Sequence, residues 1–111
     1  MDNVKNNAYY LNKMLVDIKF LMSKTAGKTL AELEADEVLC DSVLFRLIQI
    51  SENSAKVTQE YKEIHKEIPW YQIKGLRNKI VHDYGSVDMN IIYETITKDI
   101  PDLCEMLENL V

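Results

Sequence analysis

The stretch Pro69-Trp-Tyr-Gln-Ile-Lys-Gly-Leu-Arg-Asn-Lys-Ile-Val-His-Asp-Tyr84 combines a helical pattern with an unusual set of polar residues. Its apolar residues recur at helical spacing, and they define one buried side made of Trp70, Ile73, Leu76, Ile80 and Val81. Proline is favoured in the first turn of a helix and glycine just after its end. We therefore predict a helix over residues 70–82, with Pro69 in its first turn and Gly85 as its stop.

The polar residues of interest in this stretch are Arg77, Asn78, His82 and Tyr84. Asn78 and His82 are four residues apart and share a helix face. Arg77 and His82 are five residues apart, or about 140° around the axis, so one straight helix cannot aim both at one point. The end of the helix would place His82 near the negative pole of the helix dipole, which favours the imidazolium. The pattern indicates an acid/base position that is completed by a group from elsewhere.

Upstream, the first of two long helices is expected to begin with Asp2 as its N-cap and to end before Gly27. Its apolar stripe consists of Val4, Ala8, Leu11, Leu15, Ile18 and Met22, widened by Met14 and Leu21. Such a stripe also suits a coiled-coil partner, but packing into the core of the same chain is the favoured interpretation.

A second long helix is expected after the capping box Thr29-Leu-Ala-Glu32, with an interior over residues 38–57. One stripe on it is formed by Leu44, Leu47, Ile48 and Ala55, and a neighbouring stripe by Asp41, Phe45, Ile48 and Glu52. An apolar arc this wide predicts packing against several helices. At the contact edge we expect Asp41, Arg46 and Glu52, which would orient Arg77 or pair across a dimer; exposed or internally paired charges are the stronger alternative.

The remaining segments are also helical by pattern. Thr58 is expected to cap a short helix through Ile64, followed by a surface histidine, His65, with no assigned site. Asp88 is expected to cap a last helix, in which Pro101 forces a kink or a restart. No stretch alternates convincingly as a strand does. The sequence predicts an all-α fold, a bundle of four to five helices forming a single domain over residues 1–111.

The composition, with 47% hydrophobic and 28% charged residues, is that of an ordinary globular protein. The net charge of -5 argues against gripping long nucleic acid through phosphates alone. Residues 71–84 reverse the sign locally, which suits a small RNA contact, a nucleotide site, an acidic partner segment or a solvated helix face. Cys40 and Cys104 are isolated and predict buried free thiols rather than a metal site. Without a signal region or a long apolar run, a cytoplasmic protein with no membrane contact is expected.

The pattern Arg77-x4-His82-x-Tyr84, preceded by Pro69-Trp70 and by Gly75-Leu-Arg-Asn78, closely resembles the HepT-like toxins of the HEPN superfamily. The runs at 36–41 and 100–103 extend the resemblance along the chain. The resemblance implies a symmetric homodimer and a metal-independent endoribonuclease that uses no cofactor. It further implies that this ribonuclease is the toxin of a type VII-like toxin–antitoxin system.

The resemblance also implies roles for single residues. Arg77 and His82 match the catalytic motif residues, and Asn78 matches the supporting polar residue after the arginine. The implied partner is a minimal nucleotidyltransferase antitoxin of the MntA type, which adenylylates the motif tyrosine that matches Tyr84. Adenylylation there would place a bulky anion two residues from His82 and block the RNA groove.

Metal-free RNA cleavage needs a base for the 2′-hydroxyl, an acid for the leaving oxygen and a cation for the phosphorane. One protomer offers one suitable histidine, so two copies of His82 in a homodimer, flanked by two Arg77 side chains, would complete the site. Two alternatives stay open. The acidic net charge suits a non-catalytic HEPN module that binds a nucleotide or a partner nucleotidyltransferase, and the wide apolar arcs suit a helical oligomerisation subunit.

Overall fold

The structure is a computed structural model, and it describes residues 5–81 and 87–111. Within these ranges every regular element is helical, so the all-α prediction is confirmed. The elements are α1 (Asn7–Thr25), α2 (Leu30–Ala35), α3 (Glu37–Ala55), α4 (Gln59–Ile64), α5 (Trp70–Lys74), α6 (Leu76–Val81), α7 (Met89–Glu94), the π-helical turn η1 (Thr95–Asp99) and α8 (Ile100–Glu108). Because α2–α3, α5–α6 and α7–η1–α8 each follow with almost no linker, these three units together with α1 and α4 make five helical units in the described residues, within the predicted range.

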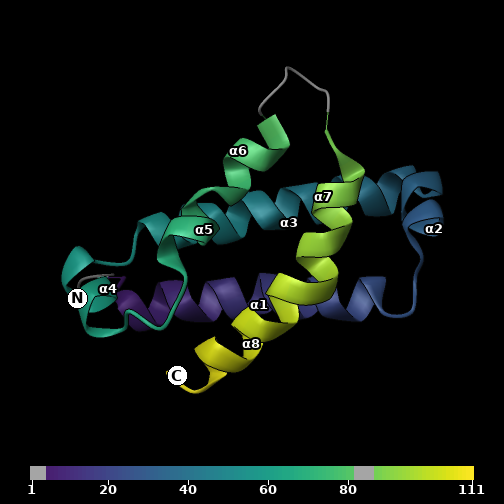
Figure 1. The fold of residues 1–111 in the computed structure, drawn as a ribbon. Helices are drawn as coiled ribbons and strands as arrows, with labels where there is room; N and C mark the ends of the chain where they lie inside the picture. The colour runs from purple at the N-terminus through teal and green to yellow at the C-terminus, as the bar shows by residue number, and fades with distance from the viewer. Residues whose placement is uncertain (1–4, 82–86) are drawn as a thin grey trace.

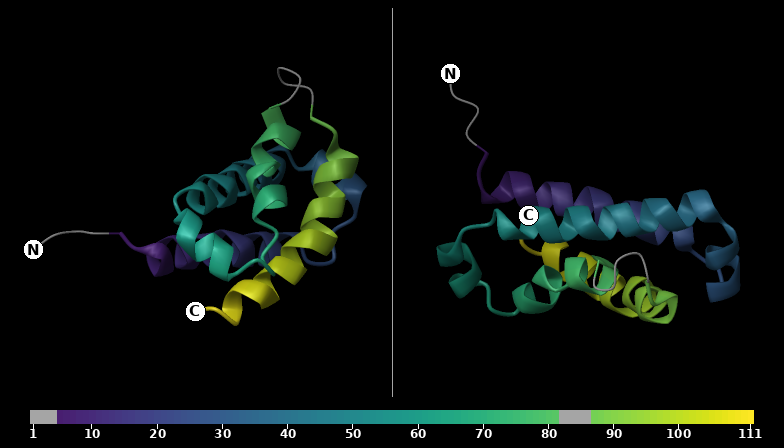
Figure 2. Two further views of the ribbon diagram at one scale, coloured as in Figure 1. Left: turned by 60° about the vertical axis from the view of Figure 1, so that its left-hand side comes forward. Right: turned by 90° about the horizontal axis from the view of Figure 1, so that it is seen from above.

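The helices are arranged in two layers. The long helices α1 and α3 lie side by side and run antiparallel, joined at one end through α2 (Figure 1). The α5–α6 and α7–η1–α8 segments cover one side of this pair, as the view from above shows (Figure 2). This arrangement places α6 against α3 and next to α7.

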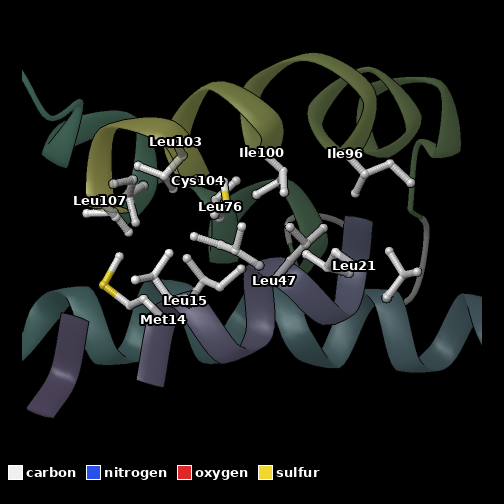
Figure 3. Close-up of a cluster of buried hydrophobic side chains, with 14 of the residues drawn as sticks. Met14, Leu15, Leu21, Leu47, Leu76, Ile96, Ile100, Leu103, Cys104 and Leu107 are labelled. Carbon is white, nitrogen blue, oxygen red and sulfur yellow. The ribbon is translucent and has the colours of Figure 1, made fainter. Parts of the chain in front are cut away.

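One aliphatic core lies between the layers. In Figure 3, Leu15 and Leu21 of α1 and Leu47 of α3 lie opposite residues of the last helical unit, among them Ile100 and Leu107. Each aliphatic side chain buried this way contributes about 1.5–3 kcal/mol relative to an exposed one. The N-terminal apolar stripe is therefore core, as the sequence favoured.

Helix α1 starts later than predicted. Its N-cap is Asn6, whose side chain accepts a hydrogen bond from the Tyr9 backbone N–H at 3.0 Å, whereas the predicted cap, Asp2, lies outside the described residues. Ala8 is exposed, so the buried stripe begins at Leu11. The predicted stop is confirmed, because Gly27 has φ +73°, a conformation that L side chains rarely adopt.

The capping box is confirmed and a long helix follows it, but the two are separated by a break at Asp36. The Thr29 hydroxyl accepts from the Glu32 N–H at 3.1 Å, and Glu32 Oε1 accepts from the Thr29 N–H at 2.9 Å. The helix then ends at Ala35, and Asp36 starts α3 by accepting from the Leu39 N–H at 3.0 Å. Asp36 takes an extended backbone (φ -102°, ψ 91°), because an aspartate there can cap the next helix instead of continuing the first.

The core face of α3 also differs from the predicted stripes. Leu47 is buried as expected, but Leu44 and Ile48 are half-buried, and Phe45 and Ala55 are exposed. The buried face instead consists of Val43, Leu47, Ile50, Ser51, Asn53 and Ser54. Because apolar residues surround much of this helix, the sequence did not define which arc faces the core. The small side chain of Ser51 lies on this face where α3 contacts α5 and α6.

The later caps match the predictions. Thr58 caps α4, and Asp88 caps α7 by accepting from the Asn90 N–H at 3.0 Å. His65 is half-buried rather than free on the surface: its ring centroid lies 4.3 Å from that of Tyr61, and its Nδ1 lies 3.5 Å from Glu67.

Pro101 lies in the first turn of α8, as the restart alternative predicted. The turn before it is the wider π-helical turn η1, which fits a position where proline has no N–H to offer. Cys40 is half-buried and Cys104 buried, both with free thiols. Among the described helices, none combines the length and the apolar character needed to cross a bilayer.

Candidate functional site

Two of the four predicted site residues lie in the described part of the chain. Arg77 and Asn78 are on α6, and both are exposed. His82 and Tyr84 lie outside the described residues, as does the predicted stop Gly85. The face that Asn78 was expected to share with His82 therefore stays a prediction.

The helix predicted over residues 70–82 is divided at Gly75 into α5 and α6. Its start is anchored by the Trp70 indole N–H, which donates to the His65 carbonyl at 2.9 Å. At the division, the hydroxyl of the buried Ser51 of α3 donates to the Lys74 carbonyl at 3.2 Å. This bond ties the beginning of α6 to α3 and thereby positions Arg77.

Glu52, the next residue of α3, lies beside Arg77. Its Oε2 is 4.0 Å from Arg77 Nε, and the two side chains are 54% and 59% exposed. The expectation that Glu52 lies at a contact edge near Arg77 is confirmed. An ion pair this exposed contributes about 0–1 kcal/mol, so it orients Arg77 without holding it tightly. Because Glu52 lies beside Nε, this pair leaves the two terminal nitrogens of the guanidinium to serve as a fork for a phosphate.

The other two predicted edge charges lie elsewhere. Arg46 Nη1 donates to Asp17 Oδ1 of α1 at 2.8 Å, and its guanidinium carbon lies 3.9 Å from the centroid of the Phe20 ring. Arg46 is thus an internally paired charge that joins α1 to α3. Asp41 is exposed.

The basic residues of α5–α6 do not form one strip. Lys79 Nζ donates to Thr95 Oγ1 of η1 at 3.5 Å, so Lys79 faces the opposite side of α6 from Arg77. Lys79 also lines a cavity of about 240 Å³ between α5–α6 and η1–α8. The apolar part of its lining includes Ile73, Leu76 and Leu103. Neither Arg77 nor Asn78 lines it.

The described residues offer few other reactive groups. In residues 5–81 and 87–111, no three His, Cys, Asp or Glu side chains come together as a metal site. Burial raises the pKa of the Cys40 thiol, and burial with nearby Glu108 raises the pKa of the Cys104 thiol. Thiols with raised pKa values are poor nucleophiles at neutral pH. Arg77 and Asn78, together with the motif that continues to His82, form the candidate site.

Comparison with known proteins places the chain in a family of ribonucleases. The family model "Ribonuclease HepT-like" matches residues 14–110. The chain is 33% identical over 101 residues to the "Putative RNase TTE0752" of Caldanaerobacter subterraneus subsp. tengcongensis, covering 91% of this chain and 90% of that protein. It is 34% identical over 80 residues to the "Probable ribonuclease HepT" of Thermococcus cleftensis, covering 68% of this chain and 73% of that protein.

A third relative is the "Gamma-glutamylcyclotransferase and putative RNase MJ0434" of Methanocaldococcus jannaschii, 31% identical over 101 residues that cover 91% of this chain and 46% of that protein. No solved structure matches the chain. The chain belongs to the HepT-like ribonuclease family, and the sequence-based expectation of an RNA-cleaving enzyme of this family is confirmed.

Sequence reasoning missed one residue that positions the site. Ser51 bonds to the chain where α5 ends and α6 begins. A serine in the middle of a mostly apolar helix would, however, be predicted to be exposed. A usable signal was its place next to Glu52, which the sequence analysis had already assigned to a contact edge.

Proposed function

We propose that the chain is the toxin of a type VII-like toxin–antitoxin system, a metal-independent endoribonuclease whose active site uses Arg77 and His82 from two copies of the chain. The observation that carries the proposal is Arg77: an exposed guanidinium, oriented by Glu52, five residues before the motif histidine in a chain of the HepT-like ribonuclease family. A positioned but exposed arginine is what recognition of an RNA phosphate requires.

The reaction divides into three roles. One His82 imidazole accepts the proton of the 2′-hydroxyl, whose oxygen attacks the adjacent phosphorus. The bond from phosphorus to O5′ breaks, and the second His82, as imidazolium, gives O5′ its proton. Arg77 stabilises the phosphorane through charge-assisted hydrogen bonds to the non-bridging oxygens, and Asn78 supports it with a neutral donor. The products are a 2′,3′-cyclic phosphate and a 5′-hydroxyl.

A homodimer supplies the second histidine, and α3 offers a surface for it. Val38 and Phe45 are 77% and 57% exposed, and they lie on the outer side of α3 that leads to Glu52. An apolar ridge that ends beside Arg77 suits contact with a second copy, because this contact would bring two Arg77 side chains to one place.

Regulation follows from the motif tyrosine. We propose that a minimal nucleotidyltransferase antitoxin transfers adenylyl groups to Tyr84, which neutralises the nuclease. An added adenylyl group carries negative charge and bulk close to His82, and both disfavour RNA phosphates.

A cleavage assay tests the nuclease proposal. Purified, unmodified protein is incubated with single-stranded RNA in excess EDTA, and product ends are identified by mass spectrometry. We expect fragments that end in 2′,3′-cyclic phosphate, together with a dimer in sedimentation of the same sample. Absence of cleavage, or cleavage that EDTA abolishes, would contradict the proposal. A protein that binds RNA, a nucleotide or the transferase without cleaving would favour the non-catalytic module that the acidic net charge suggests.

Intact mass tests the regulation. After co-expression with a neighbouring nucleotidyltransferase gene product, the wild type is expected to gain the mass of one or more adenylyl units. The Tyr84→Phe variant is expected to gain none and to keep its nuclease activity in the presence of the partner. A gain of equal size in Tyr84→Phe would assign the modification to another residue.

A further inference from the structure

The outward face of α5–α6 has a composition that the packing of the helix does not explain. Ile73, Leu76 and Ile80 point into the core. On the other side Tyr71 is 85% exposed, and Lys74 and Asn78 are exposed with it. Tyr71 and Lys74 are three residues apart and share a face of α5, and Asn78 follows on α6 beyond the division at Gly75, next to Arg77.

Gly75 lies between Tyr71 and Asn78 and adds no side chain to this surface. Its backbone (φ -74°, ψ -9°) is open to any residue. A Cβ there would lie 3.4 Å from the Gln72 carbonyl oxygen and 3.6 Å from that of Tyr71, which are ordinary contacts. Alanine would be favoured over glycine by about 0.5–1 kcal/mol in a helix. The fold therefore does not require glycine at this position, and its effect is a clear path between the tyrosine ring and Asn78.

The charge around Tyr71 is positive. The pKa of Lys62 is lowered by partial burial and by the charge of Lys74, so the two ammonium groups are close enough to repel each other. Lys62 Nζ also lies 5.6 Å from the centroid of the Trp70 ring. Lys74, three residues from the exposed Tyr71 on α5, thus lies near a second cation, and positive charge close to an exposed aromatic ring favours an anionic ligand that also carries a flat ring.

Among the described residues of α3, the exposed aromatic residue Phe45 has the opposite surroundings. Phe45 lies on the ridge of α3 that also carries Asp41 and Glu52, both acidic and exposed. Carboxylates repel a phosphate backbone, so this ridge suits a protein contact. The two faces that meet at Arg77 thus differ in charge, and RNA is favoured on that of α5–α6.

We propose that the face formed by Tyr71, Lys74, Gly75 and Asn78 binds the substrate strand next to the scissile phosphate, with Tyr71 stacking on a base and Lys74 contacting the backbone. This inference rests on the proposed nuclease function. Tyr71 and Asn78 are only seven residues apart, on the adjoining helices α5 and α6, so the contacted strand is a short run of nucleotides. A base can stack on a tyrosine only when it has left a duplex, and the substrate class is therefore single-stranded RNA.

Binding of a non-cleavable RNA tests this surface. A fluorescein-labelled 2′-O-methyl RNA 12-mer lacks the attacking hydroxyl, and its anisotropy reports Kd for the strand alone and for its duplex. Tyr71→Ala is expected to weaken single-strand binding about tenfold, because base stacking contributes about 1–3 kcal/mol. Tyr71→Phe is expected to bind as the wild type does, and Gly75→Leu, whose side chain would cover the path, is expected to bind more weakly.

The matched control is Tyr9→Ala on α1. It also removes an exposed tyrosine near a lysine, because the centroid of the Tyr9 ring lies 5.3 Å from Lys5 Nζ. Its Kd should not change. An unchanged Kd for Tyr71→Ala, or a lower Kd for the duplex than for the single strand, would refute the proposed RNA-binding surface. Neither result would contradict the nuclease proposal. Tyr71-dependent binding without cleavage would uphold the surface and refute the nuclease. Loss of the dimer in Tyr71→Ala on sedimentation would reassign the face to a protein contact and overturn the inference.

Discussion

RNA cleavage by the Arg77→Ala variant is expected to fall by about 10²–10³-fold, the usual effect of removing one donor that stabilises a developing negative charge. The side chain is 59% exposed and its pairing with Glu52 is weak, so the fold should not change. Loss of transition-state stabilisation lowers kcat more than it raises KM. His82→Ala should lose at least as much, because it removes both the base and the acid of the dimer. Single-turnover cleavage of end-labelled RNA measures both variants.

Lys98→Ala is the matched control for Arg77→Ala. Lys98 is also an exposed cation in a surface ion pair, with Nζ 3.6 Å from Glu94 Oε2, but it lies on η1. It should cleave as the wild type does. Arg77→Lys keeps the charge and loses the planar fork, so an intermediate rate is expected. If Arg77→Ala retains more than about a third of wild-type activity, Arg77 is not the phosphorane ligand.

The second large effect concerns stability. Leu47→Ala is expected to lower the free energy of unfolding by about 2–5 kcal/mol, because Leu47 is 0% exposed and packs between the two layers (Figure 3). The removed atoms leave a cavity that two packed layers of helices cannot readily fill. Urea unfolding followed by circular dichroism measures the loss. All variants are compared at one protein concentration, because dimerisation makes the apparent stability concentration-dependent.

Leu44→Ala is the control within the same helix. The sequence assigned Leu44 and Leu47 to one stripe, whereas the structure has Leu44 half-buried. Its loss should be clearly smaller than that of Leu47. Equal losses for the two variants would mean that the core face of α3 is the one read from the sequence.

Local chemistry made much of the fold predictable. Thr29 with Glu32, Thr58, Gly27 and Asp88 each act through their own hydrogen bonds or backbone preference, and each terminates or starts a helix as predicted. The break at Asp36 was missed because the same residue is compatible with a helix interior or a cap. At the division at Gly75, the hydrogen bond from Ser51 to the Lys74 carbonyl joins residues distant in the sequence, so periodicity alone could not reveal it.

The candidate site, like the fold, was predictable only in part. The motif itself singled out Arg77 and Asn78, and the edge position of Glu52 followed from its place on α3. The sequence did not reveal that Lys79 points to η1 while Arg77 points to α3, because a helical stretch with breaks does not define which neighbour each flank meets. Tyr71 carried no signal among six tyrosines until its exposure was known.

The π-helical turn η1 marks a position where the length of the chain can change by one residue. Such a turn closes i→i+5 hydrogen bonds, so it holds one residue more than an α-helical turn and is equivalent to a single-residue insertion. Because the wider turn absorbs the extra residue, deleting one residue between Thr95 and Asp99 would leave a regular helix in which α7 and α8 keep nearly the same rotation about the axis. The side chains of the turn itself would shift, among them Thr95, which accepts from Lys79 and lines the cavity beside α6. This turn is therefore the place in the last helical unit where the chain can lose a residue while α7 and α8 keep their packing.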